Sequence, residues 1–303
     1  MWQGRFDGEE PLYHRIFQRV SLEENYENIQ PNDFVLHGFA VDEGVRRNKG
    51  RVGAQDAPDL IRKNCSNFPV VQLNFKLKDF GNITCDGNLE SAQNDLAEKV
   101  QKVLEKGGKS IVFGGGHEVM FGHYSGIKKA FPDKKIGIIN IDAHFDNREM
   151  DAQIGASSGT GFWQIAQEEK IHSLHIGIQK NSNTLKLFDT AHQFGMEYIL
   201  AEELFFENLP VIYQKIEDFI EEVDVLYLTV CMDVFNVSIS PGVSALAYNG
   251  IFADPTFMHF FRLILKSEKL QALDIAEVNP LFDPQEITAR LAATLANEWF
   301  MES

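Results

Sequence analysis

The chain has 303 residues, of which 44% are hydrophobic, and its formal net charge is −16. This acidic balance argues against nucleic acid as a partner, because nucleic-acid binding depends on attraction to phosphates. The apolar content allows a large buried core and the length is ordinary for one α/β domain, so we expect a single domain over residues 1–303.

The sequence also bears on the compartment. No apolar run approaches the roughly 18 to 20 residues of a membrane span, and the first residues lack the apolar centre of a signal peptide. The cysteines Cys65, Cys85 and Cys231 are too few and scattered for a disulfide framework, which fits a reducing compartment. We expect a cytoplasmic protein with a small-molecule substrate and no membrane partner, and both a monomer and a homo-oligomer stay open.

Apolar runs of strand length alternate with helical patterns along the chain. This alternation predicts an α/β fold with a mostly parallel sheet sandwiched by helices. Helices are expected between the strands, among them Ala92–Glu105 and Glu286–Phe300. The expected strands are Phe34–Phe39, Ser110–Phe113, Ile136–Ile141, Ser173–Gly177, Glu197–Leu200, Val225–Val230 and Leu270–Ala276.

The strand Ser110–Phe113 ends in three glycines followed by His117 and Glu118. Glycines let the backbone turn tightly and place His117 at the carboxyl edge of the sheet. A dinucleotide site requires the pattern G-x-G-x-x-G. Three adjacent glycines that lead straight into a histidine therefore do not favour a nucleotide.

The strand Ile136–Ile141 is followed by polar residues at alternate positions: Asp142, His144 and Asp146. These side chains emerge where the strand ends, which is where α/β folds place their chemistry. Carboxylates with an imidazole make a hard, oxygen-rich ligand set that suits manganese or magnesium. This segment predicts a metal site.

Two later strands deliver further polar residues at their ends. Val225–Val230 leads to Cys231 and Asp233, which lie on one face, and Leu270–Ala276 leads to Glu277. Several strand ends that carry acids or histidine are hard to explain as isolated ion pairs. The set suits two ions that share bridging groups and deliver hydroxide at neutral pH. Its members are His117, Asp142, His144, Asp146, Cys231 and Asp233.

Together these motifs resemble the ureohydrolases, the family that includes arginase and agmatinase. The matching segments occur in the family's order and spread over most of the chain: Gly114–His117, Asp142–Asp146, Asp233–Gly242 and Asp274–Pro280. Within the family, the chain looks most like the formimidoylglutamases. The segments that carry this closer likeness are Gly116–Glu118, Asp142–Arg148, Ser157–Thr160, Gly242–Ala245 and the N-terminal stretch Asp42–Arg62.

The resemblance implies an arginase-like α/β/α fold and the hydrolysis of N-formimidoyl-L-glutamate to L-glutamate and formamide in histidine degradation. It also implies two manganese ions per chain. By resemblance, Asp142 and the group at position 231 bridge the ions. His117 and Asp146 complete one position, and His144 and Asp233 complete the other.

The resemblance further assigns roles to three residues. Asp146 would pass a proton to the leaving amine. Glu277 would bind the cationic formimidoyl or guanidinium group, because a carboxylate can accept two of its N–H groups. Arg148 would bind a carboxylate bidentately, which favours formimidoylglutamate over agmatine. Phe162 stands about where arginases place a proton-shuttling histidine, which argues against arginase itself.

The main departure from the family pattern is Cys231, which stands where the first aspartate of the usual D-x-D motif is expected. A thiolate is a softer ligand than a carboxylate, so the second metal position is the uncertain one. Two alternatives stay open at this point. One is another ureohydrolase of the agmatinase, arginase or guanidinobutyrase type, and the other is a metal-poor pseudoenzyme.

Overall fold

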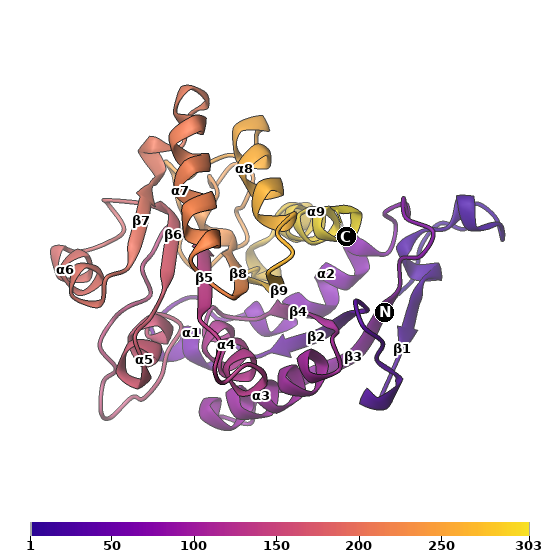
Figure 1. The fold of residues 1–303 in the computed structure, drawn as a ribbon, viewed down its shortest axis with the longest axis horizontal. Helices are drawn as coiled ribbons and strands as arrows, with labels where there is room; N and C mark the ends of the chain where they lie inside the picture. The colour runs from indigo at the N-terminus through magenta and orange to yellow at the C-terminus, as the bar shows by residue number, and fades with distance from the viewer. Residues whose placement is uncertain (1, 303) are drawn as a thin grey trace.

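Nine strands form one sheet in the computed structural model, which describes residues 2–302 (Figure 1). All neighbouring strands of this sheet pair in parallel, which requires crossover connections on its faces. Their order across the sheet is β1 (Val20–Leu22), β3 (Leu77–Thr84), β2 (Phe34–Ala40), β4 (Lys109–Gly114), β9 (Leu270–Ala276), β8 (Val225–Cys231), β5 (Ile136–Ile141), β6 (Ser173–Ile178) and β7 (Glu197–Leu200).

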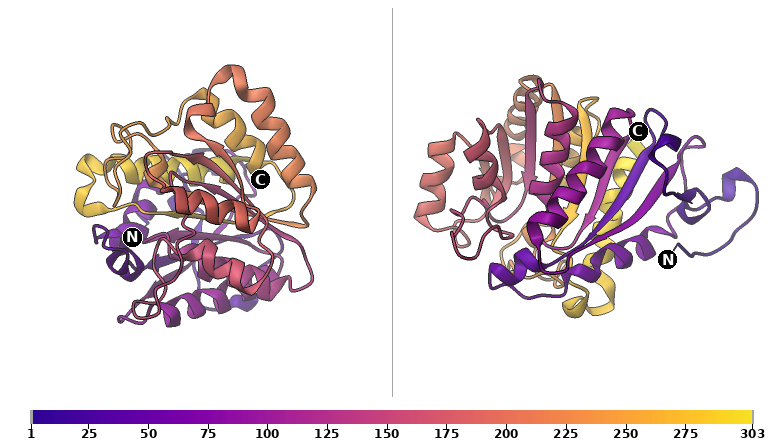
Figure 2. Two further views of the ribbon diagram at one scale, coloured as in Figure 1. Left: turned by 90° about the vertical axis from the view of Figure 1, so that its left-hand side faces the viewer. Right: turned by 90° about the horizontal axis from the view of Figure 1, so that it is seen from below.

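Helices cover both faces of the sheet and make three layers (Figure 1 and Figure 2). Apart from α1 (Glu43–Arg47), which lies in the loop after β2, each contributes to one of two apolar cores. The first core contains residues of α2 (Ala57–Cys65), α7 (Leu209–Glu221), α8 (Pro255–Leu265) and α9 (Ile287–Glu302). The second contains residues of α3 (Leu89–Glu105), α4 (Val119–Ala130), α5 (Gly161–Glu168) and α6 (Leu185–Phe194).

The central strands are buried on both faces, and this explains their composition. Every residue of β5 and of β8 is buried. Because helices cover both faces, such strands read as near-continuous apolar runs instead of alternating patterns. The predicted three-layer α/β architecture is confirmed, and the described sheet is parallel throughout.

The sequence patterns located seven of these strands but missed β1 and β3. Strand β3 was missed because it carries charged residues on a buried surface. Lys78 forms an ion pair with Asp33 at 2.9 Å, and Asp79 forms one with the fully buried Arg62 at 2.8 Å. Pairing makes such burial tolerable, and it also removes the apolar run by which a strand is recognised.

The two helices predicted by range are confirmed with shifted ends. Ala92–Glu105 lies within α3, which begins three residues earlier, at Leu89. Asn88 precedes it, and its side chain accepts a hydrogen bond from the Ser91 N–H at 2.9 Å. This capping interaction sets where the helix begins. The helix expected at Glu286–Phe300 is α9, which extends to Glu302.

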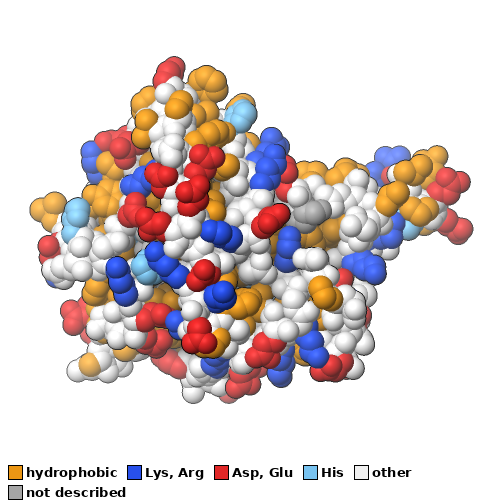
Figure 3. Space-filling view, in the orientation of Figure 1, with side chains coloured by type: hydrophobic (Ala, Val, Ile, Leu, Met, Phe, Trp, Pro, Cys, Tyr) orange, Lys and Arg blue, Asp and Glu red, His pale blue; other side chains and the backbone are white. Residues whose placement is uncertain are grey.

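On the face shown in Figure 3, acidic and basic side chains are intermingled. That face therefore has no extended patch of one charge sign of the kind that binds a polyanion. Among the described residues, no helix combines the length and the apolar character that a membrane span requires.

Candidate functional site

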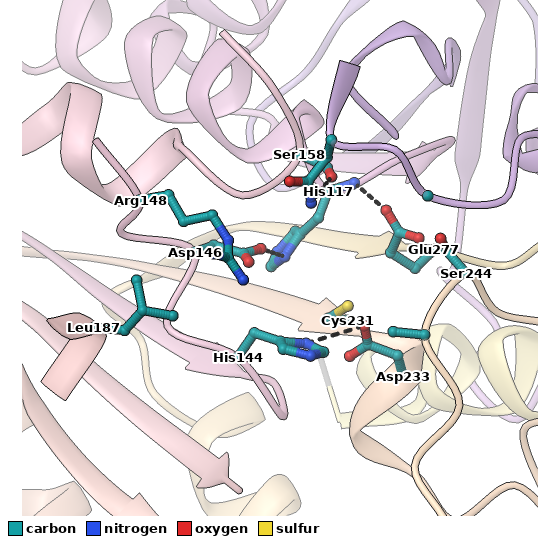
Figure 4. A pocket seen from close by; sticks show the side chains of 13 residues that line it. His117, His144, Asp146, Arg148, Ser158, Leu187, Cys231, Asp233, Ser244 and Glu277 are labelled. Atoms are coloured by element: carbon teal, nitrogen blue, oxygen red, sulfur yellow. Dashed lines mark hydrogen bonds and ion pairs between the residues drawn. The ribbon is translucent and has the colours of Figure 1, made fainter. Parts of the chain in front are cut away.

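The carboxyl ends of four adjacent strands, β4, β9, β8 and β5, meet at one edge of the sheet. They surround a pocket of about 420 Å³, a size that holds a small molecule. Figure 4 shows His117, His144, Asp146, Asp233 and Glu277, which follow these strands, with their side chains gathered around the pocket. The pocket is lined by Asn48, Gly50, His117, His144, Asp146, Arg148, Ser158, Leu187, Cys231, Asp233, Ser244, Ala245 and Glu277.

The glycine turn after β4 is required by close packing. A Cβ atom on Gly115 would lie 1.8 Å from the carbonyl oxygen of Val41. The turn also links two neighbouring strand ends, because the Glu277 N–H donates to the Gly115 carbonyl at 2.8 Å. In return, Glu277 Oε1 accepts the backbone N–H of His117 at 2.9 Å. The turn therefore fixes His117 and Glu277 relative to each other.

Two histidines each face a pair of carboxylates. His117 Nδ1 lies 3.0 Å from Asp142 Oδ2 and 2.8 Å from Asp146 Oδ2. His144 Nδ1 lies 3.4 Å from Asp142 Oδ1 and 3.3 Å from Asp233 Oδ2. Asp142 is common to both groups, and it also accepts the backbone N–H of His144 at 2.7 Å. The predicted ligand residues are thus brought together, with Asp142 at their centre.

Burial and mutual charge shift the protonation of these groups. Burial disfavours the charged imidazolium, but the neighbouring carboxylates outweigh it, so the pKa values of His117 and His144 are raised. Burial would raise the pKa of Asp142, yet the two histidines hold it below its usual range. The pKa values of Asp146 and Asp233 are raised, first by burial and also by the charge of Asp142. Buried carboxylates this close to one another favour the binding of a proton or a cation between them.

Cys231 lies inside the cluster. Its side chain is buried. The Sγ atom of Cys231, one ligand atom of His117 and one of Asp142 all lie within 4.8 Å of one another. Cys231 lines the same pocket as His144 and Asp233, so it also lies close to the other half of the site. Burial, together with the charges of Asp142 and Asp233, raises the pKa of the thiol well above its ordinary value. The position of the sulfur is compatible with the bridging role that the resemblance implies.

The residues present fit a pair of divalent cations. Two groups of possible ligands share Asp142: one adds His117 and Cys231, and the other adds His144 and Asp233. Asp233 Oδ1 is buried and has no hydrogen-bond partner among the described residues. A buried carboxylate oxygen without a partner is costly unless a cation or water satisfies it. Oxygen and imidazole donors of this kind suit manganese.

Asp146 and Glu277 are held in an uncommon backbone conformation. Their φ angles are 46° and 69°, in the left-handed region that non-glycine residues rarely adopt. Strain of this kind persists only where the surrounding structure imposes it, and it concentrates at functional sites. Burial, followed by the charges of Asp233 and Glu118, raises the pKa of Glu277 well above its usual range. A cation next to Glu277 would relieve this penalty.

Arg148 supplies a positive charge to the pocket wall. Its side chain makes no ion pair with any described carboxylate, whereas most other arginines of the chain do. In Figure 4, Arg148 and Glu277 extend from opposite sides of the pocket. Asn48 also lines the pocket, and its side-chain amide donates to Ser158 Oγ at 3.1 Å. The pocket thus has a carboxylate side and a guanidinium side.

The sequence located most of this pocket. Two loops also line it, one through Ser158 and the other through Ser244. Leu187 was missed because an apolar side chain on a helix resembles an ordinary core residue. Phe162 is fully buried on α5, with its ring 4.5 Å from His175, and it does not line the pocket. His175 is itself buried, which lowers its pKa to about 3, so it stays neutral.

Comparisons with known proteins agree with this geometry. The chain is 42% identical over 305 residues to a formimidoylglutamase of Geobacillus sp., covering 98% of this chain and 93% of the relative. It is 40% identical over 299 residues to that of Staphylococcus carnosus, covering 97% and 95%.

Solved structures extend the comparison. A Trypanosoma cruzi formiminoglutamase with Mn2+2 superposes with a TM-score of 0.85 at 25% identity, covering 95% of this chain and 98% of that one. The Bacillus subtilis formimidoylglutamase, at 20% identity and a TM-score of 0.86, covers 95% and 91% and shares the fold. The model of the arginase family matches residues 32–301. Because this match spans most of the described chain, the protein belongs to the arginase family.

Proposed function

We propose that this protein is a metal-dependent hydrolase that converts N-formimidoyl-L-glutamate to L-glutamate and formamide, a reaction of histidine degradation. The observation that carries this assignment is the identity of 40% and 42%, over nearly the full length, with two curated formimidoylglutamases. The pocket supports this assignment, because Glu277 on one side suits a cationic formimidoyl group and Arg148 on the other suits a carboxylate.

The ions that fit the cluster are two manganese ions, the metal present in the T. cruzi structure. Asp142 and Cys231 would be shared between them. His117 and Asp146 would complete one position, and His144 and Asp233 the other. When bound, such a pair of ions supplies a nucleophilic water of lowered pKa at neutral pH.

Glu277 would hold the formimidoyl group. Its Oε1 is occupied by the His117 N–H, while no described group bonds its Oε2. A substrate N–H that donates to Oε2 would bring a positive charge next to a carboxyl whose ionised form is penalised by burial. The binding energy therefore depends on the substrate being a cation, as a protonated formimidoyl group is.

Arg148 would bind a carboxylate of the glutamate moiety. It has no carboxylate partner in the described chain and lines the same pocket as Glu277. A guanidinium pairs with a carboxylate through two parallel hydrogen bonds, so it also orients the substrate. Agmatine has no carboxylate for this group.

Asp146 would transfer the proton that the leaving nitrogen requires. Burial and the charge of Asp142 raise its pKa, which brings a carboxyl group closer to the range useful for general acid catalysis. Its Oδ2 lies 2.8 Å from His117 Nδ1, so it is fixed within the cluster. A proton held on Asp146 could reach the amine as the bond from carbon to nitrogen breaks.

Substitution of the ligands tests this function. His117→Ala and Asp142→Asn should each abolish formamide release and lower the manganese content, while the protein stays folded. His259→Ala and Asp133→Asn, at exposed positions, are the matched controls and should keep both metal and turnover. Formamide release that survives loss of manganese would contradict a reaction dependent on these ions.

A further inference from the structure

A buried chain of hydrogen bonds beneath the pocket ends on His117. We propose that Asp274, acting through Thr229, is a positioning residue that holds the proton of His117 on Nε2 and leaves Nδ1 free for a cation. The inference rests on the proposed metal site and assigns a role to residues outside the pocket lining. Beyond His117, the hydrogen-bonded chain consists of Thr229, Asp274, Tyr227, His123 and Ser110.

Strand pairing places the two central members side by side. Thr229 of β8 is the register partner of Asp274 of β9. Their side chains meet, with Thr229 Oγ1 donating to Asp274 Oδ1 at 2.6 Å. On its other side, Thr229 Oγ1 lies 2.9 Å from His117 Nε2. A single hydroxyl therefore joins the carboxylate to the histidine.

The second oxygen of Asp274 is also occupied. His123 Nδ1 lies 2.7 Å from Asp274 Oδ2, and the Tyr227 hydroxyl donates to the same oxygen. Ser110 Oγ, 3.0 Å from His123 Nε2, is the outer end of the chain. All five residues beneath His117 are fully buried, so no solvent competes for these bonds.

The hydroxyl of Thr229 fixes the direction of the two central bonds. Its one proton is donated to Asp274 Oδ1. The oxygen of Thr229 must then act as an acceptor toward His117. The proton between them therefore belongs to His117 Nε2, which in a neutral ring leaves the lone pair on Nδ1.

This direction matters because Nδ1 is the atom that faces the carboxylates. It lies 3.0 Å from Asp142 Oδ2 and 2.8 Å from Asp146 Oδ2. In a neutral ring, a proton on Nδ1 would occupy the place of a cation and leave Nε2 without a proton to donate to Thr229. Partners of this kind behind a metal-binding histidine typically change metal affinity by about 10-fold to 100-fold when they are removed.

Manganese titration of metal-stripped protein, followed by electron paramagnetic resonance, tests the proposal without any substrate. Thr229→Val removes the hydroxyl at nearly constant volume and should weaken one manganese position about 10-fold to 100-fold. Thr229→Ser restores the hydroxyl and should bind within about threefold of the native protein. If Thr229→Val does not fold, Thr229→Ala takes its place in the same titration.

Ser110→Ala is the matched control, because it removes another buried hydroxyl of the same chain without touching the bonds among His117, Thr229 and Asp274. It should lower thermal stability but leave manganese affinity unchanged. Native affinity in Thr229→Val, or equal losses in Thr229→Val and Ser110→Ala, would overturn the proposal. Failure of the proposed substrate would leave these binding results intact, so the two claims can fail separately.

Discussion

Arg148 and Glu277 give the pocket two chemically different sides. Arg148 has no acidic partner among the described residues, and Glu277 is a buried acid whose pKa is raised. Each group alone is unfavourably placed, because an unpaired charge in a concave site loses part of its hydration. A single ligand that carries a cationic amidine and a carboxylate would satisfy both.

Replacement of Arg148 tests this pairing. Arg148→Ala should lower kcat/KM for formimidoylglutamate about 10-fold to 100-fold, the effect of a charge-assisted pair worth about 1.5 to 3 kcal/mol. N-butylformamidine, which has no carboxylate, should lose little. Lys49→Met, at an exposed rim residue with no ion pair in the described chain, is the control and should match the native protein. Equal losses on the two substrates would remove Arg148 from carboxylate binding.

Cys231 provides a second prediction at this scale. Manganese favours oxygen donors over sulfur, so Cys231→Asp should raise manganese stoichiometry toward about two per chain and increase affinity. Elemental analysis and manganese titration of both proteins measure this. Cys65→Ala, at a buried cysteine of α2, is the control. Unchanged occupancy and affinity in Cys231→Asp would mean that the thiol is an ordinary buried side chain and not a ligand.

At the scale of elements, the pocket rim depends on loops that are tied to one another. The Arg51 N–H donates to Ser244 Oγ at 2.8 Å, and its Nε donates to the Ser244 carbonyl at 3.1 Å. A further guanidinium N–H donates to the Val243 carbonyl. Asn279 joins from the end of β9 by donating to the Arg51 carbonyl at 2.9 Å. The loop before α2 and the loop after β8 therefore form one rigid wall.

Loosening this wall should affect binding more than chemistry. Arg51→Met keeps the length of the side chain but loses its donors, so KM for formimidoylglutamate should rise several-fold while manganese content stays native. Steady-state kinetics and elemental analysis measure the two quantities. A loss of manganese, or a fall in kcat at unchanged KM, would show that Arg51 acts on the metal cluster and not on the rim.

The extent to which the sequence predicted these elements has a physical basis. Residues that directly follow apolar strands, such as Asp142 and Asp233, could be placed because parallel strands end at one edge of the sheet. The partners of Thr229 could not be predicted in this way, because strand order and register decide that Thr229 lies beside Asp274. The ion pair of Asp79 with Arg62 joins a helix to a strand, so no local pattern reveals it.

At the scale of the whole molecule, the buried cluster makes stability depend on pH and metal. In the metal-free protein, stability should fall as pH rises above about 6.5, the ordinary pKa of histidine in an unfolded chain. His117 and His144 have a higher pKa in the folded protein than in the unfolded chain. Their contribution to the free energy of unfolding is complete below the unfolded-state pKa, and it is lost as pH rises through the folded-state pKa. The raised pKa values of Asp146 and Asp233 act in the same direction.

Asp142 does not reverse this trend, because its lowered pKa contributes stability that is already complete above its unfolded value. Manganese should oppose the trend, since it replaces the protons of the cluster and binds more tightly as pH rises. Thermal unfolding with chelator and with manganese, across this pH range, measures both effects. A metal-free protein that becomes more stable toward alkaline pH, or a manganese effect independent of pH, would contradict the account.

The most direct test of the central claim is a comparison of substrates. Purified protein with added manganese is offered formimidoylglutamate, arginine, agmatine and guanidinobutyrate, and formamide and urea are measured. The pocket predicts that formimidoylglutamate gives the highest kcat/KM and that formamide is the main product. Faster release of urea from agmatine, or no release of formamide by the manganese-loaded protein, would contradict the assignment.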